Sequence, residues 1–290
     1  MAQRPAPDTV VTGGSLVGHF EDAQSVALDP AGRLYVVDAG RDAVVRLSPV
    51  GSRYESATLG GSGTGEGEFD APADVDPTNG LVIVVADAGN ARLQRFSAEF
   101  QHLESLPVQG DATAQRDPAH GQPVYQRTDP GLQDFGDGRP VSVAVNPSDE
   151  TFALDGDRGV VVKWDAARRV VRVWGGFEDG ARRLTDPVAL AYREDRLYVA
   201  DPGRGAVVVY DEFGGPVRTL ARPLAEGVRN VAADDEALYV VLPRRVLTYS
   251  LRGRLRRVTG VNLDAPLVDA APSEDALFLL TASRLLRLEL

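Results

Sequence analysis

A strand–turn–strand unit that recurs along the chain constrains the fold more than any other feature of the sequence. Its most complete copy spans residues 65–96, where a glycine-rich segment, Phe69 and Pro72 precede a turn, an apolar run at 81–86 and an alternating run at 93–96. The apolar run is short, β-branched and bounded by turn residues, which favours a strand over a helix. One such meander cannot bury both of its faces alone, so its copies must pack against one another.

Six copies of this unit follow one another, and each is marked by the residue directly after its middle strand. These markers are Asp38, Asp87, Asp155, Asp201, Leu242 and Thr281. Successive markers are 49, 68, 46, 41 and 39 residues apart. Short strands repeated at a period in the forties predict an all-β fold: a six-bladed β-propeller of four-stranded antiparallel blades, with residues 1–290 as a single domain.

The two ends of the chain predict how the ring closes. After Thr281 there is room for only one more strand, at 285–290, so the sixth unit lacks its outermost strand. A spare strand-like segment at 8–14 precedes the first unit. We expect this segment to pair beside 285–290, which leaves neither edge open to another chain. Removal of residues 1–14 is then expected to lower stability sharply and to promote self-association.

The units resemble NHL repeats, in which a glycine-rich turn, Phe and Pro precede a strand, an Asp-Pro-x-Gly turn, an apolar strand ending in Asp and a Gly-Asn-x-Arg segment. The matching residues of the best copy are Gly65, Gly67, Phe69, Pro72, Asp76, Pro77, Gly80, Asp87, Gly89, Asn90 and Arg92. Three other copies have Arg in place of Asn, at Arg41, Arg158 and Arg204, and the last two copies keep only the strand rhythm. The resemblance implies a central channel with ligand and partner sites on the face formed by the loops that enter the innermost strands.

We expect a structural role, and not a functional one, for the repeated carboxylates Asp38, Asp87, Asp155 and Asp201. A residue that recurs in every copy serves the repeat. A short acidic side chain at a strand end can accept hydrogen bonds from backbone N–H groups of the adjoining turn. We give the repeated Arg92 the same structural interpretation.

Charged residues that differ between copies are better candidates for a site. They stand just before each innermost strand and are Asp22, Asp70, Arg139, Asp186, Glu226 and Asp264. Converging carboxylates could bind Ca²⁺, which takes about six to eight oxygen ligands, and Asp22, Asp186 and Glu226 are the first candidates. Arg139 in the same ring favours an anionic or mixed-polarity ligand instead. The alternative is that all six are solvated loop residues.

Most catalytic templates are absent from the sequence. There are no cysteines, no His-Glu-x-x-His segment and no Gly-x-Ser-x-Gly elbow. The three histidines, His19, His102 and His120, fall at different places in the repeat, so neither a His-ligated metal nor a Ser–His–Asp triad is predicted. The glycine-rich run at 60–65 has no helix after it and is interpreted as a blade-to-blade loop.

Known six-bladed propellers include metal-dependent lactonases and a metal-dependent lyase type. The lyase type needs a histidine cluster. The lactonase type carries Glu, Asn, Asn and Asp around Ca²⁺. Asn146 and Asn230 are present here, but the sequence places Asn146 in a turn on the opposite face, so the set is incomplete. We therefore expect a non-catalytic binding or scaffold propeller with a ligand or protein site at the channel mouth. A Ca²⁺-dependent, lactonase-like hydrolase that uses the acids at the channel entrance is the alternative.

Charge and composition limit the partners. The formal net charge is −11, which disfavours nucleic acid and anionic membrane surfaces. No apolar stretch approaches the roughly 18 residues of a membrane span. We expect a monomer that binds a protein or a small polar ligand. Ala2-Gln3 before a proline-rich segment resembles the start of a mature exported protein, so an extracytoplasmic location is preferred over a cytoplasmic one.

Two segments break the repeat. The interval after the second copy contains an extra loop at 107–134, which is either a binding loop on the channel face or a tolerated insertion. The second segment is a run of arginines at 244–257, in which Arg252, Arg254 and Arg256 alternate. We expect these three on one face of an outermost strand, as a solvated edge or as an electrostatic docking patch.

Overall fold

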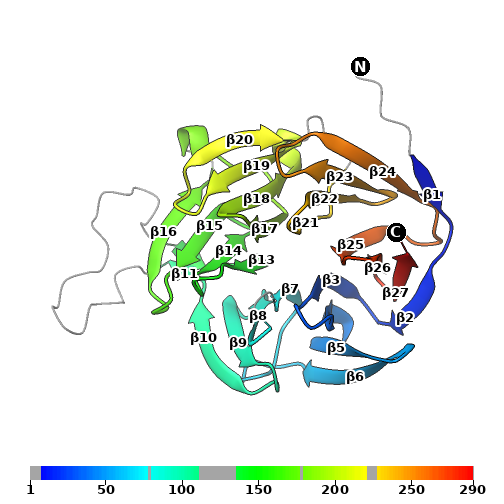
Figure 1. The fold of residues 1–290 in the computed structure, drawn as a ribbon. Helices are drawn as coiled ribbons and strands as arrows, with labels where there is room; N and C mark the ends of the chain where they lie inside the picture. Colours follow the sequence, from blue (N-terminus) through cyan, green and yellow to red (C-terminus); the bar gives the residue numbers. More distant parts are fainter. Residues whose placement is uncertain (1–7, 78–79, 111–134, 177–178, 221–226, 290) are drawn as a thin grey trace, which may run out of the picture.

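Six antiparallel sheets stand round a central channel in the computed structural model, as the repeat predicts (Figure 1). The structure describes residues 8–77, 80–110, 135–176, 179–220 and 227–289. We call the sheets blades 1 to 6, in the order of their innermost strands. Each blade has four strands in the order innermost to outermost, and blade 5 carries one more at its rim.

Within each of the first three blades, the four strands follow one another directly in the chain. Blade 1 contains β3 (Ala23–Leu28), β4 (Leu34–Asp38), β5 (Ala43–Val50) and β6 (Arg53–Gly60). Blade 2 contains β7 (Pro72–Asp76), β8 (Val82–Asp87), β9 (Arg92–Ser97) and β10 (His102–Pro107). Blade 3 contains β13 (Pro140–Val145), β14 (Thr151–Asp155), β15 (Val160–Trp164) and β16 (Val170–Gly175).

The other three blades repeat the pattern and use both ends of the chain. Blade 4 contains β17 (Ala189–Arg193), β18 (Arg196–Asp201), β19 (Ala206–Asp211) and β20 (Pro216–Leu220). Blade 5 contains β21 (Asn230–Ala233), β22 (Ala237–Leu242), β23 (Arg245–Ser250) and β24 (Leu255–Val261), with β1 (Thr9–Val11) beside β24. Blade 6 contains β25 (Leu267–Pro272), β26 (Ala276–Thr281), β27 (Arg284–Glu289) and β2 (Ser15–His19).

Three single-turn 3₁₀ helices occur within the described ranges, all in loops on one face: Ala39–Arg41, Gly180–Arg182 and Pro202–Arg204. None of the helices in this part of the chain has the length and apolar character needed to cross a bilayer.

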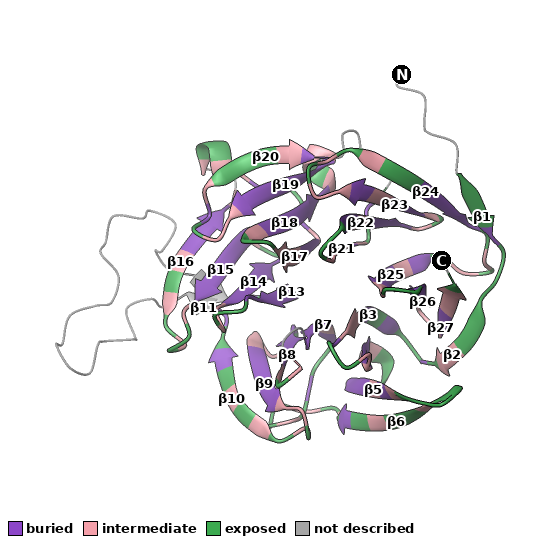
Figure 2. Ribbon diagram, in the orientation of Figure 1, coloured by how far each residue is buried: buried purple, intermediate pink, exposed green. Residues whose placement is uncertain are grey.

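The core lies between neighbouring blades. The middle strands β4 and β14 are buried at every position, whereas the outermost β6 is largely exposed (Figure 2). One interface packs Tyr35 and Val37 of blade 1 against Phe69, Ile83 and Phe96 of the second unit. Each meander thus buries its two faces against the meanders on either side, which explains why the fold needs the whole ring.

A buried ion network joins blades 2 and 3. Arg95 is 1% exposed, and its guanidinium lies 2.8 Å from carboxylate oxygens of both Glu104 and Asp149. Arg168 also binds Glu104 at 2.6 Å and Asp149 at 2.5 Å. Burial acts to raise the pKa of Asp149, but the hydrogen bonds from Arg95 and Arg168 hold it below its usual value. The network therefore keeps Asp149 ionised between the two blades.

The ring closes with β2, and the expectation that residues 8–14 form the closing strand is wrong. β2 pairs antiparallel with β27 and completes blade 6, whereas β1 pairs parallel with β24 of blade 5. The reason is connectivity: the outermost strand of blade 6 must lead into the innermost strand of blade 1 through a short loop, and only 15–19 lies next to β3. A Cβ atom at Gly14 would lie 2.7 Å from the Arg287 carbonyl oxygen, so glycine is needed where the chain crosses β27.

Two further segments differ in detail from their sequence interpretation. At the base of the 107–134 loop, β11 (Gln109–Gly110) pairs with β12 (Phe135–Asp137), and 111–134 lies outside the described residues. In blade 5, Arg252 and Arg254 precede β24, and the pairing register skips Arg256. This bulge leaves Arg256 and Arg257 both exposed, so the predicted alternation of arginines along one strand is wrong.

We predict that deletion of residues 1–19 is far more damaging than deletion of residues 1–14. The longer deletion removes β2 and opens the ring at blade 6, while the shorter one removes only the three-residue β1. The longer deletion should lower the Tm by roughly 10 °C or more and yield self-associated species, which calorimetry and gel filtration would detect. Equal melting of the two truncated chains would contradict closure by β2.

Candidate functional site

The repeated aspartates are buried hubs that hold the loops entering the innermost strands. The carboxylates of Asp38, Asp87 and Asp201 accept hydrogen bonds from the backbone N–H groups of Asp22, Asp70 and Asp186, at 2.8, 2.8 and 2.9 Å. Asp155 accepts from the N–H of Arg139 at 3.4 Å. All four aspartates have 0% exposure. Their donors lie mainly in the loop before the unit, where the sequence suggested only the turn after it.

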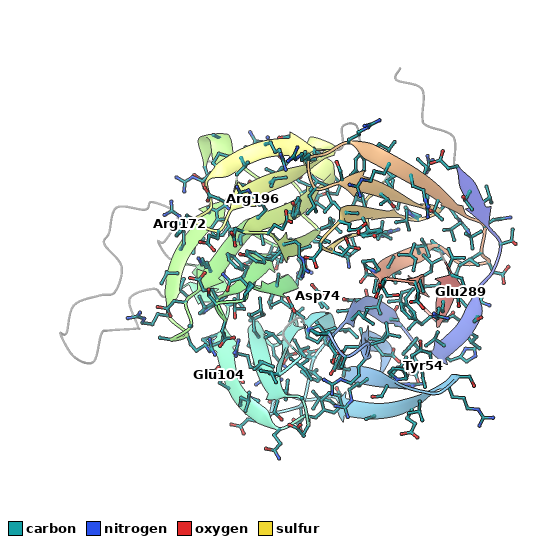
Figure 3. All side chains as sticks on the ribbon, in the orientation of Figure 1. Tyr54, Asp74, Glu104, Arg172, Arg196 and Glu289 are labelled. Carbon is teal, nitrogen blue, oxygen red and sulfur yellow. The ribbon has the colours of Figure 1, made fainter. Side chains whose placement is uncertain are left out.

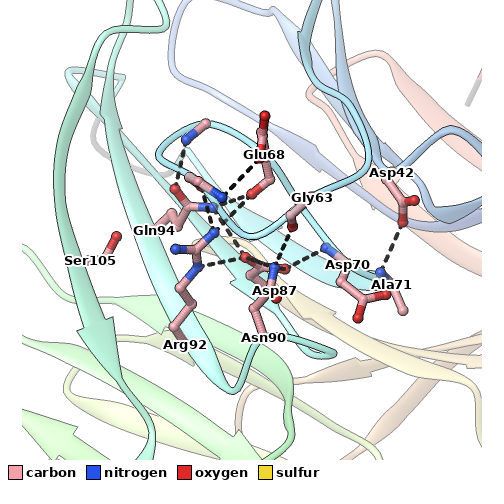
Figure 4. A network of polar contacts seen from close by, with 12 residues as sticks. Asp42, Gly63, Glu68, Asp70, Ala71, Asp87, Asn90, Arg92, Gln94 and Ser105 are labelled. Carbon is pink, nitrogen blue, oxygen red and sulfur yellow. Dashed lines mark hydrogen bonds and ion pairs between the residues drawn. The ribbon is translucent and has the colours of Figure 1, made fainter.

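Asp87 shows the most complete hub (Figure 4). Its carboxylate accepts hydrogen bonds from Asn90 Nδ2 at 3.0 Å, Arg92 Nε at 2.8 Å and Gln94 Nε2 at 3.1 Å. Gln94 and Arg92 in turn bind backbone groups of the glycine-rich loop, with Gly67 N–H donating to Gln94 Oε1 at 2.9 Å. The motif residues of this copy therefore bind one another and fix a loop.

Four of the six candidate residues, Asp22, Asp70, Arg139 and Asp186, lie at loop ends held by these hubs through their own backbone N–H groups. Asp22, Asp70, Asp186 and Asp264 are exposed. Arg139 pairs with Asp157 at 2.7 Å, and Asp264 lies 3.4 Å from Arg284. Glu226 falls outside the described residues. Within the described ranges no three or more His, Cys, Asp or Glu side chains gather in a way that could hold a metal ion.

A cavity of about 280 Å³ occupies the channel between the six innermost strands. It extends to the carboxyl-terminal ends of these strands and the turns that follow them, where Asp29, Pro30, Arg193, Asp234 and Pro272 line it. The candidates within the described ranges, Asp22, Asp70, Arg139, Asp186 and Asp264, stand at the opposite ends of the same strands, and none of these five lines it. The structure therefore offers a partly open cavity at the end of the channel that the sequence did not favour.

A girdle of six aligned positions, one on each innermost strand, contributes four polar residues to the wall of this cavity, Ser25, Asp74, Asn230 and Asp269. We define it as the innermost-strand residues that pair with the residue directly before each marker: Ser25, Asp74, Ser142, Ala189, Asn230 and Asp269. Figure 3 shows Asp74 close to the centre of the ring. This position holds Ser in two blades, Asp in two, and Ala and Asn in one each, so it varies between blades whereas the marker aspartates recur.

The girdle side chains also link neighbouring innermost strands. Asp269 accepts a hydrogen bond from Val26 N–H at 2.8 Å, and Asp74 accepts one from Val143 N–H at 2.9 Å. Each innermost strand has a sheet partner on one side only. The N–H groups on its other edge therefore need acceptors from outside its own blade. The hydroxyls of Ser25 and Ser142 both donate to Asp74, at 2.5 and 2.6 Å.

The two girdle carboxyls are buried, and their protonation is perturbed. Burial raises the pKa of Asp74, against the lowering effect of the hydrogen bonds from Ser142 and Ser25. Burial raises the pKa of Asp269 well above its usual range, and the neighbouring charge of Asp74 adds to the rise. The groups that bind them are hydroxyls and backbone N–H groups, so the cavity wall can hold a proton or attract a cation.

The outer part of the cavity mixes charges of both signs. The Arg193 guanidinium binds Asp235 at 2.8 Å, and the Tyr239 hydroxyl donates to Asp234 at 2.8 Å. Asn230 uses its Oδ1 atom to accept from Val231 N–H at 2.7 Å. Asn146 serves its own turn instead, because its Oδ1 accepts from Ser148 and Glu150 N–H groups. Of the two asparagines, Asn230 alone lines the cavity.

Sequence reasoning missed the girdle, although a signal was present. The girdle residue stands 13 positions before the marker in the first three copies and 12 positions before it in the last three, and Asp74 and Asp269 there have apolar neighbours on both sides. A carboxyl or amide amid a buried strand is unusual enough to single out.

Comparison with known proteins identifies the fold. No family model matches the chain, and no curated protein matches it in sequence. A gluconolactonase from Xanthomonas campestris has a similar structure, with a TM-score of 0.66 and 13% identity over 95% of this chain and 88% of that one. A luciferin-regenerating enzyme gives 0.62 and 13%, over 93% and 92%. An inactive virginiamycin B lyase from Staphylococcus aureus gives 0.60 and 10%, over 91% and 78%. At such low identity the likeness shows the six-bladed β-propeller fold alone.

We predict that Asp87→Ala costs about 3–5 kcal/mol of unfolding free energy, because it removes the fully buried acceptor shared by Gln94, Arg92 and the Asp70 N–H group. Chemical denaturation would measure the loss. Asp70→Ala is the matched control: its side chain is exposed, and its N–H still reaches Asp87, so it should change stability by less than about 0.5 kcal/mol. Equal effects of the two substitutions would contradict the hub.

We predict that the stabilising contribution of Asp269 is complete below the unfolded-state pKa of about 4 and is lost as the pH rises through the raised folded-state pKa. Asp269→Asn cannot ionise, so its disadvantage relative to the parent should be greatest in acid and should shrink as the pH rises. Denaturation curves between about pH 3.5 and 8 would test this. A difference that does not vary with pH would contradict the raised pKa.

Proposed function

We propose that the protein is an NHL-type propeller that binds a small polar ligand carrying a positive charge in the channel cavity. The observation that carries this proposal is the pair of buried girdle carboxyls, Asp74 and Asp269, in the wall of a cavity of about 280 Å³. That volume is near the lower end, about 300 Å³, of small-molecule sites. An ammonium group would supply the counter-charge that hydroxyls and N–H groups do not.

The charge of the whole cavity supports a cationic ligand. The acidic residues that line it are Asp29, Asp74, Asp76, Asp234 and Asp269, and Arg193 is the basic residue among the described lining. Arg33 pairs with Asp29 at 2.5 Å, and Arg193 with Asp235 at 2.8 Å, so these two cations are already engaged. A low-dielectric wall with an excess of carboxyls focuses a field that attracts small cations.

We favour binding over chemistry in this cavity. Neither His19 nor His102 lines it, and the hydroxyls of Ser25 and Ser142 donate to a carboxyl instead of facing a base. A serine held in this way is not activated as a nucleophile. A protein partner on the entrance face, bound through Asp22, Asp70, Arg139, Asp186, Glu226 or Asp264, is a variant of the same binding proposal.

Ca²⁺-dependent hydrolysis is the competing proposal. It is favoured by the fold shared with a gluconolactonase and by the oxygens of Asp74, Asp269 and Asn230 at one girdle. The donor set fits poorly, however. Each Asp74 oxygen already accepts two hydrogen bonds, whereas Ca²⁺ needs about six to eight free oxygen ligands. The entrance acids Asp22, Asp186 and Glu226 are the other candidate ligands for the ion.

We predict that a series of small primary and quaternary amines contains ligands detectable by calorimetry and thermal shift. Ala232→Leu should weaken binding by tenfold or more, because Ala232 lines the cavity and is partly exposed. Ala265→Leu is the matched control, since Ala265 stands in a loop on the entrance face, and it should bind as the parent does. Loss of binding in Asp186→Asn but not in Ala232→Leu would move the site to the entrance face.

The same preparation tests the competing proposal. Elemental analysis and melting with EDTA or added Ca²⁺ should show no stoichiometric metal and no shift in Tm. A stoichiometric Ca²⁺ whose removal lowers the Tm would overturn binding without metal and would favour the hydrolase.

A further inference from the structure

A serine, a histidine and a glutamate meet on the outer surface of blade 2, far from the channel. His102 Nε2 lies 3.0 Å from Ser105 Oγ, and His102 Nδ1 lies 3.5 Å from Glu66 Oε2. His102 and Ser105 belong to β10, and Glu66 comes from the glycine-rich loop that enters the blade. Each ring nitrogen thus faces one partner, in the order nucleophile, base and carboxylate.

The pairing of β10 brings its two residues to the same face. Residues three apart in a regular strand lie on opposite faces. The register between β9 and β10 skips Leu103, so that His102 stands opposite Phe96 and Ser105 stands opposite Gln94. Phe96 and Gln94 are two apart in β9 and share a face, and their partners therefore do so too. Bulges commonly re-aim a side chain in this way beside functional sites.

The loop that carries Glu66 is fixed by the buried Gln94. Gly67 N–H donates to Gln94 Oε1 at 2.9 Å, and Gln94 Nε2 donates to the Glu68 carbonyl at 2.6 Å (Figure 4). Arg92 binds the Gly65 carbonyl at 2.7 Å, so the backbone on both sides of Glu66 is anchored. The Asp87 hub holds Gln94 and Arg92 in turn.

The histidine is held, whereas its partners are accessible. The His102 side chain is 16% exposed, and its ring meets the edge of Phe96 with centroids 5.6 Å apart. Ser105 is exposed, and the Glu66 side chain is 79% exposed. Because a carboxylate only accepts hydrogen bonds, Glu66 favours the tautomer with the proton on Nδ1, which leaves Nε2 free to accept the serine proton.

We propose that Ser105, His102 and Glu66 form a second site, which cleaves small activated esters by acyl transfer. Ser105 Oγ attacks the ester carbonyl and its proton passes to His102 Nε2. The C–O bond to the alcohol breaks and that proton leaves with the alcohol. Water then attacks the acyl-serine, gives its proton to His102, and releases the acid as Ser105 recovers its hydrogen. Glu66 orients the ring and stabilises its charged form.

The position of the site sets its substrate class. β10 is the outermost strand of its blade, so alternate backbone N–H groups along it are not used by the sheet and can face a developing oxyanion. Ser105 and Glu66 are exposed, so the described residues do not enclose an acyl group bound there. Unhindered esters with good leaving groups, such as acetyl esters of phenols, are therefore the expected substrates.

The full chain should be treated with a fluorophosphonate, which phosphonylates activated serines with loss of fluoride, and assayed with p-nitrophenyl acetate. Peptide mass mapping should place the label on Ser105. Ser105→Ala should abolish it, and His102→Gln should slow labelling and hydrolysis by about 100-fold. Glu66→Gln, at an exposed position, should slow both by a smaller factor without changing the Tm.

Matched controls come from the equivalent strand of blade 1 and from the closing strand. Ser56→Ala removes an exposed serine of β6, and His19→Ala removes an exposed histidine of β2; both should label and hydrolyse as the parent does. Absence of label at Ser105, or labelling at an unchanged rate in folded His102→Gln, would overturn the proposal. Amine binding in the channel is unaffected by either result, so the two sites are tested separately.

Discussion

An innermost strand of a propeller blade has a hydrogen-bonding partner on one side only, and the rest of this structure depends on how its other side is satisfied. At the strand's beginning, the buried Asp38, Asp87, Asp155 and Asp201 accept the N–H groups of the entering loops. In its middle, girdle residues such as Asp74 and Asp269 accept N–H groups of the next blade. Removal of these acceptors would leave unpaired donors around the whole channel, at a cost of about 1–3 kcal/mol each.

This constraint also separates the residues that maintain the repeat from those that are free to vary. The marker aspartates do the same task in four blades and therefore recur. The girdle does related work with a hydroxyl at Ser25 and with carboxyls at Asp74 and Asp269, and so gives the channel wall an uneven charge. The side chains that line the channel site also join the blades. A substitution there is therefore expected to change both the affinity for a ligand and the stability of the fold.

The fold could be predicted from the sequence because the residue pattern that specifies each blade repeats along the chain. The six strand runs, the turn at residues 76–80 and the residues around Asp87 are local patterns, and each reports on structure within a few positions. The closing strand was misplaced because β-propensity alone does not distinguish residues 8–14 from 15–19; the short loop into β3 decides between them. The girdle was missed because polar residues in strands have no local signature. The Ser105–His102 contact was invisible because a bulge reverses the alternation between them, and Glu66 is brought to them by a loop.

Blade 6 contains three strands from the end of the chain and one from its beginning. During synthesis, β2 leaves the ribosome first among the blade strands, and β27 leaves last. In every other blade the four strands of the meander are contiguous in the chain and can assemble as soon as they have emerged, although β1 is added to the rim of blade 5. The ring therefore stays an open arc until β27 has emerged, and the pairing of β2 with β27 comes late in folding.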